Sequence, residues 1–218
     1  MAAWAFFPVA RRGMWGLLAL ILSVVFPAAA IAQGKPLTIL AFGDSLVAGF
    51  GLGSRDGFTA KLETALKAKG VEARVVNAGL SGDTSAGGLA RLDWALESKP
   101  DFAIVELGAN DGLRGLDPAQ TRANLDAILS KLKAKGVPVL FAGMYAPPNM
   151  GPDYGKAFNA LYPELARKHG VAFYPFFLEG VAAEAALNQP DGIHPNAKGV
   201  DIIVEKILPH VLKLIGKS

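Results

Sequence analysis

The feature that most restricts the fold of this chain is a short helix-ending sequence that recurs at 67–71, 133–137 and 167–171. Each copy carries two or three basic residues followed by Gly and Val. Cations in the last turn of a helix favour the negative end of its dipole, and a following Gly accepts the left-handed conformation that ends a helix. Each copy therefore predicts the end of a helix shortly before a strand.

Strand-like and helical patterns alternate along the chain after residue 36. We expect strands at residues 37–42, 73–77, 102–107, 137–144 and 171–174. We expect helices at 58–69, 85–96, 117–135 and 155–169, and a last helix that begins near Asn196 and has a kink or break at Pro209. Alternation of this kind predicts a mostly parallel sheet covered by helices on both faces, which is a doubly wound, three-layer α/β/α fold.

The first 32 residues have the layout of a secretory signal peptide. They contain Arg11 and Arg12, no acidic residue, an apolar run and a small-x-small sequence that ends at Ala32. This layout predicts export, to the periplasm or outside the cell, with cleavage after Ala32. The alternative is an uncleaved anchor, because residues 13–32 carry no charge and are long enough to span a bilayer. We expect residues 33–218 to form a single domain, since a second would be cramped.

Charge and cysteine content exclude several functions. The chain has 22 basic and 19 acidic side chains, and removal of residues 1–32 takes away two arginines and no acid. The remaining domain is nearly neutral, which does not favour nucleic acid as a partner. The absence of Cys excludes disulfides, a thiol nucleophile and a Cys-ligated metal. We expect a monomer with no cofactor, no metal and no stable protein partner.

Polar motifs follow four of the predicted strands. They are Gly43-Asp44-Ser45, Asn77-Ala78-Gly79, Gly108-Ala109-Asn110-Asp111 and Asp191-Gly192-Ile193-His194. Each motif taken alone is explained by a turn or a helix cap, because Gly, Asn, Asp and Ser favour those conformations. In a parallel α/β sheet, however, ligands bind at the carboxyl ends of the strands. Four such motifs at one edge indicate a functional site there.

The side chains in these motifs meet the requirements of a serine hydrolase. Ser45 is a poor nucleophile until a histidine accepts its proton, and a carboxylate orients that histidine. His194 can accept the proton, and Asp191, three residues earlier, can emerge on the same side of a turn. The oxyanion formed during attack on an ester needs fixed donors. The N–H groups of Ser45 and Gly79 and the side-chain amide of Asn110 can supply them.

The four motifs resemble those of the GDSL or SGNH hydrolases, a family named for a Ser, a Gly, an Asn and a His. The sequences that carry the resemblance are Phe-Gly-Asp-Ser-Leu at 42–46, Asn-Ala-Gly-Leu-Ser-Gly-Asp-Thr-Ser at 77–85, Glu-Leu-Gly-Ala-Asn-Asp at 106–111 and Asp-Gly-Ile-His-Pro-Asn at 191–196. The similarity spans roughly residues 37–212. Within the family the chain resembles the small bacterial periplasmic arylesterases, also described as acyl-CoA thioesterase I or lysophospholipase L1.

The resemblance implies a fold and a set of roles. The fold is a flavodoxin-like sheet of five parallel strands in the order 2-1-3-4-5. The roles are a nucleophile at Ser45, a triad completed by Asp191 and His194, and an oxyanion hole formed by Ser45, Gly79 and Asn110. The α/β-hydrolase fold is disfavoured, because the residue two after Ser45 is Val47 and the Gly of its nucleophile elbow is missing.

The expected substrates are esters of short to medium acyl chains, aryl esters, lysophospholipids and thioesters. The segment 144–154 is rich in Pro, Gly and aromatic residues, which predicts a loop that forms a wall of an acyl pocket. The candidate substrate-binding residues are Leu80, Met144, Tyr145 and Phe176. Ordinary packing also explains the last three of these residues.

Other functions remain open at this point. A carbohydrate O-acetyl esterase of the same family would act only on acetyl groups carried by sugars. A non-catalytic lipid- or glycan-binding protein would be expected to lack at least one catalytic side chain, whereas this chain has all three. A nucleotide-binding module is disfavoured, because residues 43–49 lack the Gly spacing and the Lys of a phosphate loop.

Overall fold

The computed structural model describes residues 1–5 and 35–217. Residues 35–217 belong to one compact unit. Residues 6–34 lie outside the described residues, so nearly all of the expected signal peptide and its cleavage site after Ala32 do so as well. No helix within the two described ranges is both long and apolar enough to cross a membrane.

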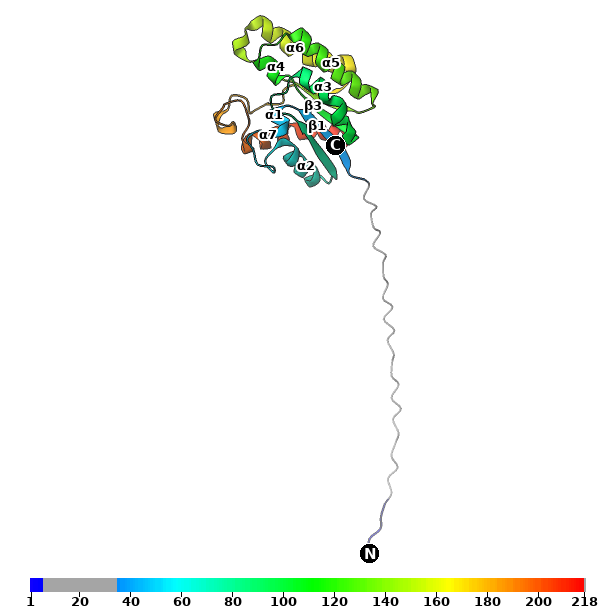
Figure 1. The fold of residues 1–218 in the computed structure, drawn as a ribbon. Coiled ribbons are helices and arrows are strands. Elements are labelled where there is room, and N and C mark those ends of the chain that lie inside the picture. Colours follow the sequence, from blue (N-terminus) through cyan, green and yellow to red (C-terminus); the bar gives the residue numbers. More distant parts are fainter. Residues whose placement is uncertain (6–34, 218) are drawn as a thin grey trace. The chain divides into compact units, whose positions relative to one another are not determined.

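A parallel sheet forms the centre of the compact unit (Figure 1). Its five strands are β1 (Leu37–Gly43), β2 (Ala73–Gly79), β3 (Phe102–Glu106), β4 (Val139–Ala142) and β5 (Ala172–Tyr174). Their order is β2-β1-β3-β4-β5 and every pair is parallel, which confirms the expected fold. The central strands β1, β3 and β4 are apolar and buried along almost their whole length, as strands covered on both faces must be.

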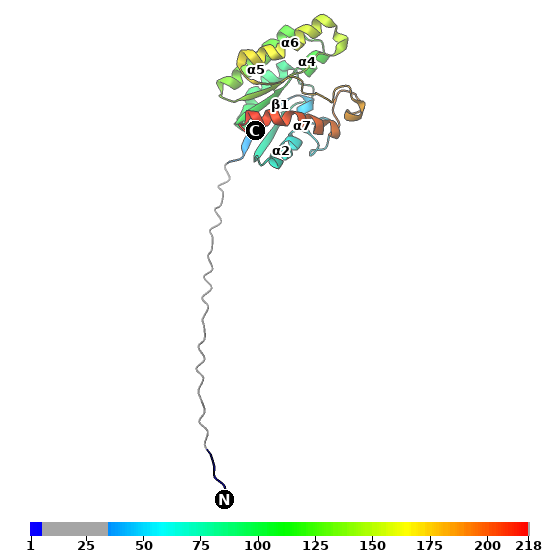
Figure 2. The same ribbon diagram turned by 180° about the vertical axis from the view of Figure 1, so that it is seen from behind.

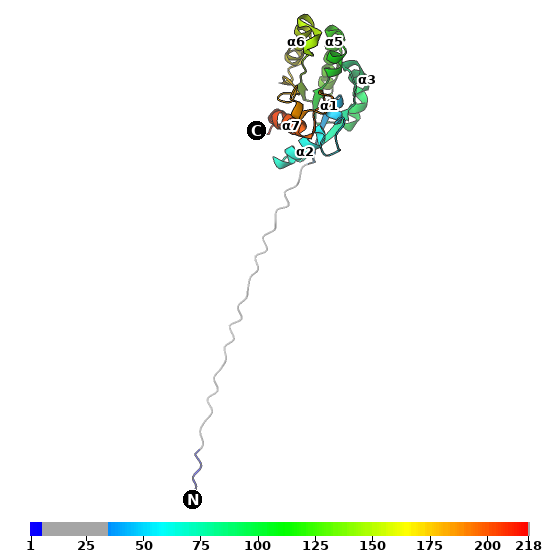
Figure 3. The same ribbon diagram turned by 90° about the vertical axis from the view of Figure 1, so that its left-hand side faces the viewer.

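Helices cover both faces of the sheet. They are α1 (Ser45–Ala48), α2 (Phe58–Ala68), α3 (Ser85–Ala95), α4 (Ala109–Leu113), α5 (Pro118–Ala134), α6 (Pro152–His169) and α7 (Ala197–Leu214). The helices α2 and α7 pack together on one face, while α3, α5 and α6 lie on the other (Figure 3). Figure 2 shows α7 beside α2 from behind. Each of these helices turns an apolar stripe towards the sheet, which is why the layers hold together.

The three recurring helix-ending sequences behave as expected. The helices α2, α5 and α6 end just before Gly70, Gly136 and Gly170. These glycines have φ angles of +73°, +71° and +67°, which is the left-handed conformation that L side chains rarely adopt. The prediction of three helix ends is therefore confirmed.

Two helices differ from the prediction at their prolines. A kink or a break was expected at Pro209, and the helix α7 continues through this residue without a break. Ile207 and Val211, on either side of this proline, are fully buried, and tertiary packing of this kind outweighs a lost backbone hydrogen bond. The helix α6 begins at Pro152, three residues earlier than expected, because proline suits the first turn of a helix.

The register of the strands aligns the ends of β1, β2 and β3, where three of the polar motifs begin. Gly43 at the end of β1 pairs with Gly79 of β2 and with Glu106 of β3. The segments that follow these residues therefore begin side by side at the carboxyl edge of the sheet. This edge carries the site.

Candidate active site

Ser45 is the first residue of the one-turn helix α1. Asp44 caps this helix, because its carboxylate accepts the N–H of Leu46 at 3.0 Å. Ser45 is 9% exposed and lines the main cavity of the domain. Within the described residues, no hydrogen bond is made by the N–H of Ser45. Ser45 therefore reaches the cavity with an N–H group that is not engaged elsewhere.

The structure brings His194 and Asp191 to Ser45. Nε2 of the His194 ring lies 2.9 Å from Oγ of Ser45, and Nδ1 lies 2.7 Å from Oδ2 of Asp191. A carboxylate can only accept a hydrogen bond, so Nδ1 carries a proton and Nε2 of the neutral ring is free to accept one. The serine hydroxyl thus donates to Nε2.

Asp191 is held in its ionised form. Its Oδ1 accepts the N–H groups of Ile193 and His194, each at 3.0 Å. Hydrogen bonds from the backbone N–H and the ring of His194, and from the N–H of Ile193, lower the pKa of Asp191 to about 2. The carboxylate therefore stays negative at any pH at which an enzyme of this type would act.

Two residues that the sequence analysis did not select hold the histidine segment. The ring of Phe50 packs on the ring of His194, with the centroids 4.5 Å apart. The amide of Gln189 donates to the carbonyl of Phe50 at 2.8 Å and to that of Pro195 at 2.9 Å. These contacts tie the end of α1 to the histidine segment. Neither residue type signals such a role in a sequence.

The expected role of Gly79 is not supported by its position. Gly79 is the last residue of β2, and its N–H donates to the side chain of Asn77 at 3.0 Å. Gly79 is also absent from the lining of the main cavity, whereas Gly82, three residues later, is part of it. Gly82 has a φ angle of +81°, and its N–H makes no hydrogen bond to any described residue. The structure thus offers Gly82 in place of Gly79.

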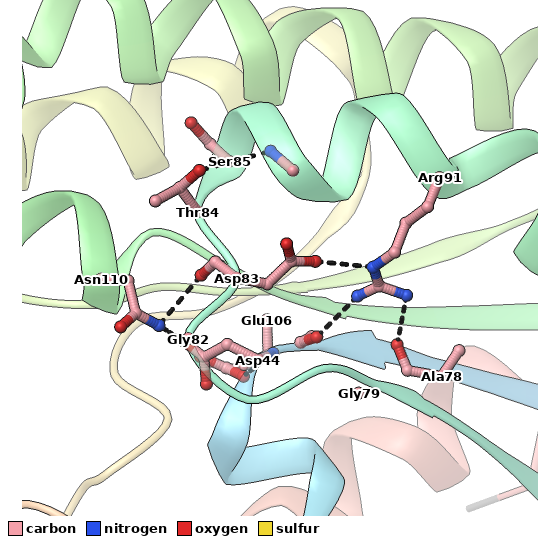
Figure 4. Close-up of polar contacts among 12 residues, drawn as sticks. Asp44, Ala78, Gly79, Gly82, Asp83, Thr84, Ser85, Arg91, Glu106 and Asn110 are labelled. Atoms are coloured by element: carbon pink, nitrogen blue, oxygen red, sulfur yellow. Dashed lines mark hydrogen bonds and ion pairs between the residues drawn. The ribbon is translucent and has the colours of Figure 1, made fainter.

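Asn110 lies in the cavity wall as expected, but its amide is already engaged. Its Nδ2 donates to the carboxylate of Asp44 at 3.1 Å and to the carbonyl of Asp83 at 2.9 Å (Figure 4). An amide nitrogen has two hydrogens, so both are used in this ligand-free arrangement. These bonds hold the amide of Asn110 between the side chain of Asp44 and the backbone of Asp83.

Asp111, the residue after Asn110, forms a buried hydrogen-bond network with Ser85 and Thr121. Its carboxylate accepts the N–H of Ser85 at 2.8 Å and the hydroxyl groups of Ser85 and Thr121 at 2.5 and 3.1 Å. Asp111 is 1% exposed, so this network fixes the first turn of α3 to α4 and α5 away from water. We infer that it serves the architecture of the site.

Glu106, the last residue of β3, is a buried acid that lies next to Asp44, the residue before the nucleophile. Both side chains are fully buried, and Oε2 of Glu106 accepts the N–H of Asp44 at 3.4 Å. Oε1 of Glu106 has no partner among the described residues. Burial raises the pKa of Asp44 to about 6, and burial together with the charge of Asp44 raises the pKa of Glu106 well above its usual range. Burial thus disfavours the charged form of Glu106.

The main cavity has a volume of about 520 Å³. It is lined by Ser45, His194 and Asn110 on its polar side, and its other walls are mostly apolar. The candidate residues Met144, Tyr145 and Phe176 line it, and the rings of the last two stack 4.5 Å apart. Leu80, the remaining candidate, does not line the cavity and is 53% exposed. Its N–H is fixed to the carbonyl of Gly43, which leaves the side chain on the solvent side of the turn.

No group of three or more His, Asp or Glu side chains in residues 1–5 and 35–217 is arranged to hold a metal ion.

The fold and the site define a class. A doubly wound parallel sheet that carries Ser, His and Asp in this hydrogen-bonded order at its carboxyl edge is characteristic of serine hydrolases. Residues 41–202 match the GDSL-like Lipase/Acylhydrolase family, and the chain belongs to that family.

Named relatives agree with this assignment. The chain is 45% identical over 184 residues to Esterase TesA of Pseudomonas aeruginosa, a match that covers 84% of this chain and 92% of the relative. It is 40% identical over 180 residues to Thioesterase 1/protease 1/lysophospholipase L1 of Escherichia coli, covering 82% and 85%. The structure of the psychrotrophic esterase EstA from Pseudoalteromonas sp., inhibited by monoethylphosphonate, superposes with a TM-score of 0.78 at 34% identity, covering 83% and 99%. The expected family and the expected class, an ester hydrolase, are thus confirmed.

Proposed function

We propose that this protein is an exported esterase that forms an acyl-enzyme at Ser45 and hydrolyses it with water. The observation that carries the proposal is the pair of hydrogen bonds that runs from Oγ of Ser45 through the ring of His194 to Asp191. The order of the groups is that of a nucleophile, a base and an orienting acid. All three are within hydrogen-bond reach without any substrate to assemble them.

The reaction has two halves. In the first, Oγ of Ser45 attacks the ester carbonyl and its proton moves to Nε2 of His194, while Asp191 stabilises the resulting imidazolium. His194 then gives the proton to the departing alcohol oxygen, which leaves the acyl group on Ser45. In the second half, a water molecule attacks the acyl-enzyme with His194 as base, and the acid leaves as Ser45 regains its proton.

The oxyanion that forms in both halves needs donors that face the cavity. The unengaged N–H groups of Ser45 and Gly82 meet this requirement. Asn110 is the third donor, and its amide must release or share its hydrogen bond to Asp44 when the oxyanion forms. Gly82 replaces Gly79 in this assignment.

The size and the lining of the cavity favour an acyl chain or an aryl group. A volume of about 520 Å³ lies within the usual range for ligand cavities, and the walls include Met144, Phe176 and Leu178. Such a cavity is larger than an acetyl group requires, so it favours esters of short to medium chains, aryl esters and lysophospholipids over acetylated carbohydrate. Thioesters belong to the proposal because a relative is named as a thioesterase.

Export is the remaining part of the proposal. It is supported by residues 1–32, whose sequence has a basic start, an apolar run and a small-x-small site that ends at Ala32.

Activity on p-nitrophenyl esters from acetate to palmitate tests the catalytic part. Ser45→Ala and His194→Ala should each lower kcat by up to roughly 10⁶-fold, since a triad acts as a unit. Matched controls are Ser98→Ala, whose hydroxyl only donates to Ala95, and His210→Ala, whose ring packs against Tyr174. These controls should retain wild-type kcat.

The outcomes separate the candidate functions. Full activity in Ser45→Ala would refute the acyl-enzyme. Hydrolysis confined to acetyl esters of sugars would replace the lipid-ester proposal with the carbohydrate one, and ligand binding without turnover would identify a binding protein. A loss of activity with EDTA would show a metal requirement that the proposal does not contain.

A further inference from the structure

The side chain of Arg91 lies across the carboxyl ends of β1 and β2 (Figure 4). It extends from α3 and is 16% exposed. Nη1 donates to the carbonyl of Ala78 and Nη2 donates to the carbonyl of Gly43, each at 2.8 Å. Nε donates to the carboxylate of Asp83 at 2.6 Å, and the guanidinium carbon lies 4.4 Å from the centre of the Phe42 ring. Every nitrogen of the guanidinium group is therefore engaged.

These contacts fix backbone groups that lead directly into the site. The carbonyl of Gly43, one residue before the cap of α1, also accepts the N–H of Leu80 at 3.1 Å. A single carbonyl thus joins the end of β1 both to Arg91 and to the turn that contains Gly82. A shift of the guanidinium group would move Ser45 relative to Gly82.

Asp83 connects Arg91 to the third oxyanion donor. Its carboxylate pairs with Arg91, while its carbonyl accepts an amide N–H of Asn110 at 2.9 Å. Asp83 also directly follows Gly82 in the chain. Its side chain is only 9% exposed, so loss of the arginine would leave a largely buried charge without a partner.

Arg91 lies outside the reaction itself. Arg91 does not line the main cavity, so it would not touch a substrate bound there. It nevertheless contacts the segments that carry Ser45 and Gly82, and it is linked to Asn110 through Asp83. We propose that Arg91 is a positioning residue that holds Ser45, Gly82 and Asn110 in the arrangement that stabilises the oxyanion. The proposal rests on the proposed function, because it assumes an oxyanion bound by these groups.

The substitution Arg91→Lys tests it. Lysine keeps the charge, but its single nitrogen cannot reach Asp83 and both carbonyls in the fixed fork of a guanidinium group. A misplacement of about 1 Å in an active site costs on the order of 10²-fold, so we expect kcat to fall by about 10- to 100-fold with KM nearly unchanged.

A second readout depends on the oxyanion donors directly. A p-nitrophenyl alkylphosphonate transfers its phosphonyl group to the serine oxygen and releases p-nitrophenolate, and the phosphonyl oxygen occupies the place of the oxyanion. Its rate of inactivation should fall by the same factor as kcat in Arg91→Lys. Both rates are expressed per mole of folded enzyme, with the folded fraction measured by circular dichroism and thermal melting.

Two further variants complete the experiment. Arg122→Lys is the matched control, because Arg122 forms an ion pair of 2.7 Å with Glu164 on the outer helices α5 and α6. It should leave kcat and the inactivation rate unchanged. Asp83→Asn keeps the carbonyl that Asn110 uses but removes the charge that Arg91 binds, and it should lower both rates in the same direction. This variant carries the test if Arg91→Lys does not fold.

Wild-type rates in the folded Arg91→Lys and Asp83→Asn proteins would overturn the positioning role. A loss of activity that merely follows the unfolded fraction would do the same, because it would show a structural role alone. Failure of the proposed function has a different signature: Ser45→Ala would then be as active as the wild type, whatever the result for Arg91.

Discussion

The buried carboxyl group of Asp44 should make the stability of the domain depend on pH. Burial raises its pKa from 3.8 to about 6 in the folded state, while the unfolded chain keeps the ordinary value. Between about pH 4 and pH 6 the folded state therefore binds more protons than the unfolded state, and the free energy of unfolding falls as the pH rises. This stabilising contribution is fully present below about pH 4 and is lost as the pH passes through about 6.

The size of the effect follows from the shift. One pKa unit corresponds to about 1.4 kcal/mol, so a shift of about two units is worth about 3 kcal/mol. Asp44 is fully buried, so little of this is screened by water. The charge of Asp44 also raises the pKa of Glu106, which adds a contribution of the same sign.

The perturbation is Asp44→Asn, which removes the titrating group but keeps an oxygen that can accept a hydrogen bond. Urea unfolding of the wild type and the variant is measured at a series of pH values from about 4 to about 7. The free energy of unfolding of the wild type minus that of the variant should fall by about 2 kcal/mol between about pH 4 and about pH 7, since part of the contribution is already lost at about pH 4. Comparing two proteins cancels the titration of carboxylates common to both, such as Asp191.

The control is Asp93→Asn, which removes an exposed carboxylate paired with Lys131 at 2.9 Å. An exposed pair contributes about 1 kcal/mol or less, so the control difference should be nearly flat with pH. If the free energy of unfolding of the wild type minus that of Asp44→Asn stays constant or rises with pH, the reasoning is refuted. Either result would mean that Asp44 is not held as an acid of raised pKa.

Three further predictions concern two glycines and the N-terminal segment. Gly79→Ala should lower the melting temperature, because its Cβ would lie 2.2 Å from the backbone nitrogen of Ala48, and overpacking of this kind costs about 1–3 kcal/mol. In Gly82→Ala the Cβ would meet only Nη2 of Arg114, at an ordinary contact distance of 3.7 Å, but φ is positive. About 1–2 kcal/mol of strain should therefore displace its N–H and lower kcat more than stability; wild-type kcat would contradict its role. In secreting cells, N-terminal sequencing of the purified protein should begin at Gln33, whereas a sequence that begins at Met1 would support the anchor instead.

The order of strands and helices could be predicted because each element carries a local signal. The helix ends at Gly70, Gly136 and Gly170 are the clearest case, since a basic last turn and a left-handed glycine depend on neighbours in the chain alone. The path of α7 through Pro209 could not be predicted in this way. It depends on the burial of Ile207 and Val211 against other elements, which the local sequence does not contain.

The site residues also fall into those that local sequence predicts and those that depend on the tertiary structure. Ser45, Asp191 and His194 could be selected from their residue types and their places after strands, and the structure brings them together. The choice between Gly79 and Gly82 could not be made, because it depends on where β2 ends. The strand continues two residues beyond its predicted end at 77, which places Gly79 in the sheet and leaves Gly82 in the turn.

Arg91 was missed for a related reason. A basic residue on a helix is normally read as part of a solvated face, and nothing in its neighbours shows that it is shielded. Only the tertiary structure shows that it reaches the carbonyls of Gly43 and Ala78, which are 48 and 13 positions away in the chain.

The base and its orienting acid are neighbours in the chain, whereas the nucleophile comes from far away. His194 and Asp191 are three positions apart, but His194 and Ser45 are separated by 149. His194 and Asp191 can therefore pair within a single turn of the chain. The pairing of Ser45 with His194, in contrast, requires almost the entire domain to be synthesised and folded. Until the segment that carries His194 has been made and folded against α1, Ser45 lacks the base that accepts its proton.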